Sequence, residues 1–259
     1  MNAQIVQERL ETWVKSNFEL TRDVCLKMEH CRSVFDLSTK IAKVEEMNEE
    51  DTFIAQVIAA LHDCGRFPQI ILFHTFLDNE IYNHSIEGAK LLENGLLEEF
   101  LPETREYDNI IIQAVRYHGL KDLPPETVGE RTMMHTKLIR DADRTDIFER
   151  SVNQFELLFT TVGIGTSKTI TPGVKKSFLE RKSISVKLLQ SQLDMLTLRF
   201  GLIGQYEFLA ALELIEENKY IERLTRLFLE KRSNYDQSEI IWLEEQAQKL
   251  LALRKKELA

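Results

Sequence analysis

The amino-acid sequence predicts an all-α protein, for three reasons. Apolar residues recur at intervals of three and four over most of the chain, whereas the alternating pattern typical of strands is rare. Only 10 Gly and 5 Pro interrupt the 259 residues. Hydrophobic residues make up 43% and charged residues 29%, so the chain has the composition of a globular protein that buries a full core.

Five segments in the first part of the chain have the apolar spacing of helices. They are residues 21–44, 51–63, 83–95, 107–120 and 132–151. Asn83 or Ser85 is the expected N-cap of the third segment, and Gly95 is its expected end. Asp108 and Gly119 bound the fourth segment in the same way.

The segment 51–63 predicts a largely buried helix that ends on two polar side chains. Asp51 is its expected N-cap, and Gly65 is the expected residue after its end. His62 and Asp63 then fall in the last turn. Because burial of such side chains is costly without partners, the pair either caps the helix or binds a metal.

Other segments break the helical pattern. They are the loop 66–82, the proline-rich loop 121–130 and the Gly- and Thr-rich segment 160–176, where a short hairpin or a mobile loop is expected. Three helical patterns follow, the last at residues 238–259. We expect a first helical domain over residues 1–155 and a helical extension packing on it over 156–259, or both parts as one domain.

The segment 160–176 contains two glycines that need a separate interpretation. Gly163 and Gly165 give a superficial likeness to a phosphate-binding loop. The Lys-Ser/Thr ending and the flanking strand and helix are missing from the sequence, so a plain turn is expected there. The helices beyond this segment are expected to form core or the surface of a homodimer.

Charge and cysteine content exclude several classes of function. With a net charge of −9 the chain repels polyanions, so binding of extended nucleic acid is not expected. Charges throughout residues 1–20 argue against a signal peptide, and no run of about 18 apolar residues predicts a membrane span. Cys25, Cys31 and Cys64 form no Cys-x-x-Cys pair and no disulfide framework, which is typical of a cytoplasmic protein with reduced thiols.

The histidines carry the strongest functional signal. Of the six, His30, His62 and His118 lie beside apolar residues of predicted helices, and His84 begins another helix. The order along the chain is His, His-Asp, His, His, Asp. Imidazole and carboxylate ligands suit Zn, Fe, Mn, Ni and Co, and a site with positions left open for water is catalytic.

With this order the chain resembles the HD superfamily of metal-dependent phosphohydrolases, over roughly residues 20–150. His30 resembles the first histidine of that family. His62 and Asp63 resemble the doublet for which it is named, and Asp143 resembles its closing aspartate. The resemblance implies an HD-domain helical bundle with a C-terminal helical extension, which binds one or two divalent transition-metal ions.

Two further histidines resemble those of the family branches that hold two metals. They are His84 and His118. The chain also resembles a bacterial subgroup of uncharacterised HD proteins with the signatures HD-x-GRF, TF-x-D and RDAD-x-x-DIF, for which a phosphohydrolase class but no substrate is implied.

The resemblance implies a two-metal site in which Asp63 bridges the ions. The remaining ligands are then His30, His62 and Asp143 at the first ion, and His84 and His118 at the second. A hydroxide held between two such ions has a pKa near neutrality and attacks phosphorus in line. Asp141 competes with Asp143 for the closing role, but the two face different sides of a helix, and the family pattern favours Asp143.

Three residues outside this ligand set are candidates for catalysis or substrate binding. Arg66 and Arg144 are expected to stabilise the phosphoryl oxygens, or alternatively to pair with nearby aspartates. His74, in a loop near the site, is a candidate substrate contact. Neither His74 nor His135 fits a motif position, so a structural role is expected for both, with substrate contact as the other option for His74.

We therefore expect a cytoplasmic, metal-dependent phosphohydrolase that acts on a small phosphoester such as a nucleotide. Two alternatives remain, a di-iron oxygenase of the same superfamily and a non-catalytic sensor or interaction protein that a metal stabilises. The cyclic-dinucleotide phosphodiesterase branch is disfavoured, because its Gly-Tyr-Pro signature is missing from the sequence and His118 is followed by Gly119.

Overall fold

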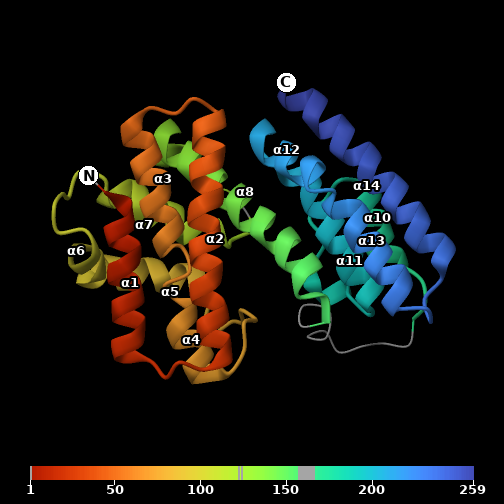
Figure 1. Ribbon diagram of the computed structural model, residues 1–259, viewed down its shortest axis with the longest axis horizontal. Helices are drawn as coiled ribbons and strands as arrows, with labels where there is room; N and C mark the ends of the chain where they lie inside the picture. Colours follow the sequence, from red (N-terminus) through yellow and green to blue (C-terminus); the bar gives the residue numbers. More distant parts are fainter. Residues whose placement is uncertain (1, 122, 124, 157–166) are drawn as a thin grey trace. The chain divides into compact units, whose positions relative to one another are not determined.

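The computed structural model describes residues 2–121, 123, 125–156 and 167–259 (Figure 1). All regular elements in these ranges are helices, so the predicted all-α class is confirmed. The chain separates into two compact units, residues 1–143 and 144–259. Within the described ranges no helix combines the length and the apolar character that a membrane crossing requires.

The first unit is built from helices of very different length. They are α1 (Ala3–Asn17), α2 (Arg22–Val44), α3 (Glu49–Leu61), α4 (Arg66–Phe73), α5 (His84–Leu91), α6 (Leu97–Phe100), α7 (Asp108–His118) and α8 (Glu130–Asn153), the last of which runs on into the second unit. A π-helical turn at Leu92–Leu96 joins α5 to α6, and a 3-10 turn at Glu126–Val128 precedes α8.

The helix α3 forms the centre of this unit, in contact with α1, α2 and α7 (Figure 1). Ile54, Val57, Ile58 and Leu61 are fully buried, and the helix is apolar on nearly all sides. A helix of this composition is stable only when neighbours cover its whole circumference. The end of α3, which the His-Asp pair follows directly, is therefore surrounded by the other helices.

The start of α3 differs from the expectation. Asn48, and not Asp51, is the N-cap, because its side-chain oxygen accepts the backbone N–H of Asp51 and the helix begins at Glu49. The carboxylate of Asp51 instead accepts hydrogen bonds from Arg131 and His135, and so ties α8 to α3. His135 therefore has a structural contact, in agreement with the role expected for it.

The expected loop 66–82 is also wrong in part, because residues 66–73 form α4. Phe67 and Ile70 provide the buried face of this helix. Pro68 lies in the first turn of this helix, where a missing N–H is tolerated.

The role expected for Gly65 is corrected too. It does not follow α3 in a left-handed conformation but precedes α4 with φ −71°. A Cβ added there would lie 2.2 Å from the carbonyl oxygen of His84 and 2.6 Å from the backbone nitrogen of Gly88. Glycine is required at position 65 because α5 packs directly against the backbone that follows the His-Asp pair.

Other predicted limits agree with the structure within a few residues. Asn83 is the N-cap of α5, and Gly95 has a φ of 109° inside the π-helical turn that follows. Asp108 is the first residue of α7 and not its cap, which is Tyr107. Gly119 follows the end of α7 as expected.

The second unit consists of the end of α8 and five further α-helices within the described residues. These are α10 (Pro172–Leu179), α11 (Gln192–Gly201), α12 (Leu209–Glu217), α13 (Tyr220–Lys231) and α14 (Gln237–Leu258). The sequence predicted only three helices after the segment 160–176. Short helices separated by turns were missed because each is too short to show a clear apolar period. Aromatic side chains including Phe148, Phe200 and Phe228 are fully buried in this unit.

The segment 160–176 lies partly within the described residues. Residues 160–166, including Gly163 and Gly165, lie outside the described residues, so the turn expected there stays a prediction. Residues 172–176 begin α10, with Pro172 at its first position, so the expected hairpin or loop is wrong for them.

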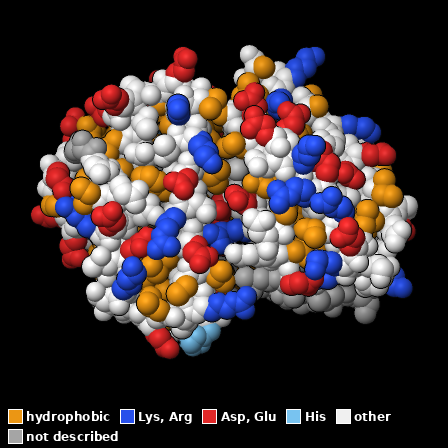
Figure 2. Space-filling view, viewed as in Figure 1, with side chains coloured by type: hydrophobic (Ala, Val, Ile, Leu, Met, Phe, Trp, Pro, Cys, Tyr) orange, Lys and Arg blue, Asp and Glu red, His pale blue; other side chains and the backbone are white. Residues whose placement is uncertain are grey.

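Basic and acidic side chains are interspersed over the face in Figure 2. No broad area of one charge covers this face. Attraction of a charged ligand there would therefore depend on a few individual side chains.

Candidate metal centre

The predicted ligands come from five elements of the first unit. His30 lies on α2, His62 and Asp63 follow α3, His84 is the first residue of α5, His118 is the last of α7, and Asp143 lies on α8. The five residues before Asp143 in this list are each at most 5% exposed. Burial of this many titratable side chains in one place requires that they satisfy one another or a bound ion.

The first group of ligand atoms surrounds one oxygen of Asp63. His30 Nε2 lies 3.3 Å from Asp63 Oδ2 and 3.2 Å from Asp143 Oδ1. His62 Nε2 lies 3.3 Å from the same Asp63 oxygen and 3.2 Å from His30 Nε2. Nitrogen and oxygen atoms of the four side chains therefore converge on one point.

The second group surrounds the other oxygen of the same carboxylate. His84 Nε2 lies 3.4 Å from Asp63 Oδ1, and His118 Nε2 lies 3.7 Å from it. The two imidazole nitrogens are 3.1 Å apart. Asp63 Oδ1 is buried and accepts no hydrogen bond from the residues that the structure describes. Asp63 thus presents one oxygen to each pair of histidines.

Hydrogen bonds within the helices orient two of the imidazoles. His62 Nδ1 donates to the carbonyl oxygen of Ala59 at 2.7 Å, and His118 Nδ1 donates to that of Val115 at 2.7 Å. Both histidines lie at helix ends, where the carbonyl three residues earlier has no helical partner. A neutral imidazole that donates from Nδ1 keeps a lone pair on Nε2. These lone pairs face the carboxylate of Asp63.

The charge states favour binding of a cation. Burial raises the pKa of Asp63, but the Lys27 ammonium and the His62 imidazole outweigh burial, and the pKa lies well below its ordinary value. Burial lowers the pKa of His62, and it lowers that of His84 to about 4. The centre therefore combines an ionised Asp63 with neutral imidazoles of His62 and His84 near pH 7, and such donors fit divalent transition metals.

The choice between the two aspartates of α8 is also visible in the geometry. Asp143 is the residue whose carboxylate reaches His30, and its pKa is lowered, since hydrogen bonding from His30 outweighs burial. Asp141 is fully buried on the same helix. The metal-binding role of Asp143 stays a prediction that this position supports.

Lys27 is a residue of the centre that the sequence pattern did not single out. It lies one turn before His30 on α2, and its Nζ is 2.5 Å from Asp63 Oδ2. Its side chain is 15% exposed, so the ammonium lies between the buried ligands and solvent. Lys27 precedes His30 by three residues, so both side chains lie on the same face of α2, and this spacing is the sequence signal from which Lys27 could have been found.

Arg66 lies beside the centre, where it bonds to the chain itself. Its NH1 donates to Gln69 Oε1 at 2.6 Å, to the carbonyl oxygen of Phe76 at 2.6 Å and to Asp78 Oδ1 at 3.1 Å. Its Nε lies 3.6 Å from Asp63 Oδ1. Arg66 therefore holds the segment after α4 against the centre, and its contact with phosphate stays a prediction.

The other two candidates are Arg144 and His74. Arg144 is the first residue of the second unit, where its guanidinium donates to the backbone and side-chain oxygens of Gln205. His74 is exposed at the end of α4, with a left-handed backbone at φ 51°. Neither position tests the predicted substrate contacts.

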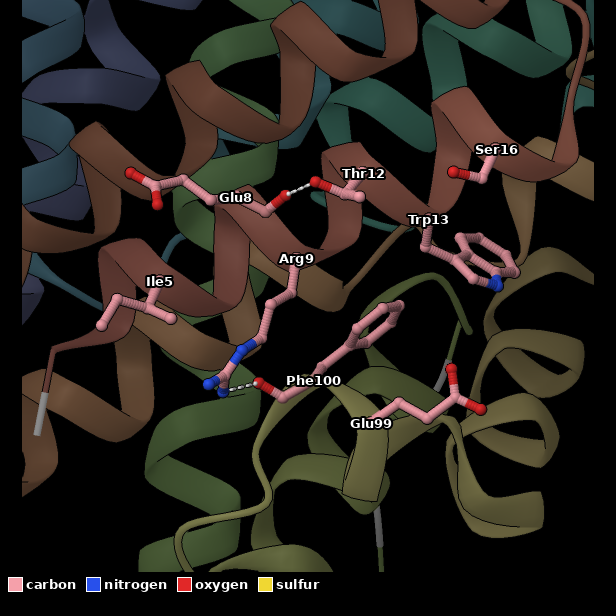
Figure 3. Close-up of a pocket in the computed structure, with 8 residues that line it drawn as sticks. All are labelled: Ile5, Glu8, Arg9, Thr12, Trp13, Ser16, Glu99 and Phe100. Atoms are coloured by element: carbon pink, nitrogen blue, oxygen red, sulfur yellow. Dashed lines mark hydrogen bonds between the residues drawn. The ribbon is translucent and has the colours of Figure 1, made fainter.

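A separate groove of about 460 Å³ lies on α1 and α6 (Figure 3). Trp13 and Phe100 form its apolar part, and the Arg9 guanidinium donates to the carbonyl oxygen of Phe100 and to Glu103. None of the residues that line it is a predicted metal ligand. The groove is therefore distinct from the candidate centre.

A comparison with known families finds a match in the part of the chain that holds the predicted ligands. Residues 28–151 match the family model described as HD domain. This range includes all six predicted ligands, from His30 to Asp143. No curated protein and no solved structure matches the chain significantly. Over residues 28–151, which are 124 of the 259 residues, the chain is therefore similar to the HD domain family.

Proposed function

We propose that this protein is a metal-dependent phosphohydrolase that acts on a small phosphoester, such as a nucleotide or a related mono- or diester. The observation that carries the proposal is the position of Asp63, whose two oxygens face two separate pairs of histidines. A carboxylate in this position is suited to bridging two cations. Similarity to the HD domain family supports the hydrolytic class, since its members are mostly metal-dependent hydrolases.

The proposed ligand set uses every converging side chain. His30, His62 and Asp143 serve one ion, His84 and His118 serve the other, and Asp63 serves both. Fe, Mn, Zn, Ni and Co are all compatible with imidazole and carboxylate ligands. Ions bound here would lower the pKa of a coordinated water and supply a hydroxide that attacks phosphorus.

The chain's own cations complete the proposed site. Lys27 now holds Asp63 Oδ2, and a metal would compete with it for that oxygen. Its partly exposed ammonium is then free to bind a phosphoryl oxygen and stabilise the charge that develops there. We assign a similar electrostatic role to Arg66, which is anchored beside Asp63. Arg144 and His74 stay candidates for substrate contact.

The proposed chemistry lies within residues 1–155, which we assign as the HD-type domain, with residues 156–259 as a helical extension. We propose that the protein works in the cytoplasm, alone or as a homodimer. Its cysteine content and acidic charge support this assignment.

The test combines metal analysis with turnover. Purified protein is assayed for bound metals and for release of phosphate from a panel of nucleotides and other phosphoesters, with each metal added in turn. Asp63→Asn should abolish turnover, because it removes the shared charge. His135→Gln is the matched control, since His135 is equally buried but bonds to Asp51 outside the centre.

Three results would contradict the proposal. Turnover that Asp63→Asn leaves unchanged would exclude this centre as its source. Iron-dependent oxygen consumption without phosphate release would favour the di-iron oxygenase alternative. Stabilisation by metal without turnover of any substrate would favour the sensor alternative.

A further inference from the structure

Asp78, in the segment after α4, is surrounded by hydrogen-bond donors. Its Oδ1 lies 3.1 Å from Arg66 NH1, 3.1 Å from Gln69 Nε2 and 3.1 Å from the backbone nitrogen of His84. His84 Nδ1 lies 2.7 Å from Oδ2 and 2.9 Å from Oδ1. Only a carboxylate offers two oxygens that accept on both sides at once.

The position of His84 in its helix makes an external acceptor necessary. His62 and His118 donate from Nδ1 to the carbonyl oxygen three residues earlier in their own helices. His84 is the first residue of α5, so no preceding helical turn supplies such a carbonyl. The segment 74–83 supplies Asp78 in its place.

We infer that Asp78 is a positioning residue that holds His84 in the tautomer with the proton on Nδ1. The Nε2 lone pair of His84 then faces Asp63 and His118, where a second metal ion would bind. The inference rests on the proposed function only in assigning an ion to that position. Carboxylates that orient metal-binding histidines in this way typically change ion affinity by about 10- to 100-fold.

Substitution by asparagine separates this role from simple packing. In Asp78→Asn the single oxygen has to face the donors of Arg66, Gln69 and the His84 backbone. The amide nitrogen then takes the place of Oδ2, opposite His84 Nδ1. His84 Nδ1 also lies 2.9 Å from the oxygen that is kept, but that oxygen already faces three other donors. Because two donors do not face each other, the amide N–H at the 2.7 Å position favours acceptance at Nδ1 and a proton on Nε2. That tautomer has no lone pair to offer a metal.

A second residue anchors the same segment without touching His84 Nδ1. The Tyr82 hydroxyl donates to the carbonyl oxygen of Gly65 at 2.7 Å. Tyr82→Phe removes this bond and loosens the segment, while the contact between Asp78 and His84 is left in place. It is the matched control for a role of Asp78 that is only structural.

The first measurement reads the tautomer directly. Long-range proton–nitrogen correlation spectra of metal-free protein labelled with ¹⁵N-histidine assign the protonated nitrogen of His84. We expect Nδ1 in the wild type and in Tyr82→Phe, and Nε2 in Asp78→Asn. Protonation of Nε2 in the wild type would overturn the inference without any variant, and so would an unchanged tautomer in Asp78→Asn.

The second measurement is metal affinity by competition with a chelator, using Mn²⁺ or Zn²⁺ alone. We expect Asp78→Asn to weaken the second ion by about 10- to 100-fold, while the first ion and the helical circular dichroism are unchanged. Equal weakening in Tyr82→Phe would overturn the positioning role. If the wild type binds metal but releases no phosphate, the proposed function fails and the inference stands. If the wild type binds no metal, the His84 tautomers in the metal-free wild type and variants still decide whether Asp78 is a positioning residue.

Discussion

Replacement of Gly65 by alanine tests how the backbone after the His-Asp pair is packed. The added Cβ would lie 2.2 Å from the carbonyl oxygen of His84, 2.6 Å from the nitrogen of Gly88 and 3.0 Å from its Cα. All three atoms belong to the backbone of α5, so no side chain can rotate away to make room. The start of α5 must move away from the turn, and His84 moves with it.

The expected loss of stability follows from this geometry. Real Cβ atoms essentially never approach heavy atoms within 3.0 Å, so the His84 oxygen has to retreat from 2.2 Å to at least that distance. Overpacking of a core costs about 1–3 kcal/mol. We expect Gly65→Ala to lie at the upper end, about 3 kcal/mol, which is a large part of a typical stability of about 5–15 kcal/mol.

The assay is urea unfolding followed by tryptophan fluorescence. Trp13 reports on the first unit and Trp242 on the second, since each unit contains one tryptophan. Gly173→Ala is the control, because its Cβ would meet only the Leu188 methyl groups, at 3.8 Å. This helical position should gain about 0.5–1 kcal/mol in the second unit. A loss below about 1 kcal/mol in Gly65→Ala would refute the argument from close packing.

Three further predictions concern the centre and the thiols. Gly119→Ala places a Cβ 2.7 Å from His84 Cε1 and 2.9 Å from His84 Nε2, so the imidazole ring must turn. We expect metal binding to be about tenfold weaker in competition with a chelator, and an unchanged affinity would contradict this. Burial lowers the pKa of His84 to about 4, below the ordinary value of about 6.5, so the unfolded chain takes up the extra proton between these values. Metal-free protein should therefore lose up to about 3 kcal/mol of stability as the pH falls through this window. Urea unfolding at several pH values measures this loss. If the stability of His84→Asn fell equally steeply with pH, His84 would not be its source. Cys25 is exposed, whereas Cys31 and Cys64 are buried, and burial raises the pKa of Cys64 to about 12. One thiol should therefore react with a disulfide reagent in the native protein, and all three should react in urea. A second thiol that reacts fast in the native protein would be inconsistent with this burial.

Some features of the centre were predictable because they depend on local pattern. Helical spacing placed His30, His62 and His118 on helices, and the structure places them there or in the turn directly after one. The two-residue separation of Asp141 and Asp143 on one helix predicted that they face different ways. The family resemblance, which the match of residues 28–151 confirms, supplied the order of the ligands.

Other features depended on contacts between distant segments. Nothing local to the sequence of α4 indicated that Arg66 bonds to Phe76 and Asp78. The close approach of α5 to Gly65 could not be read from either segment alone, and for this reason the glycine was assigned to the helix end.

The sequence by itself determined the helical class and the set of side chains able to bind metal, because periodicity and residue chemistry are properties of the chain. Only the tertiary structure decided how Asp63 divides its two oxygens between two pairs of histidines, and that Lys27 and Asp78 accompany them. These relations join residues on different helices, and their distances are set by how the helices pack around α3. No spacing along the chain encodes such distances.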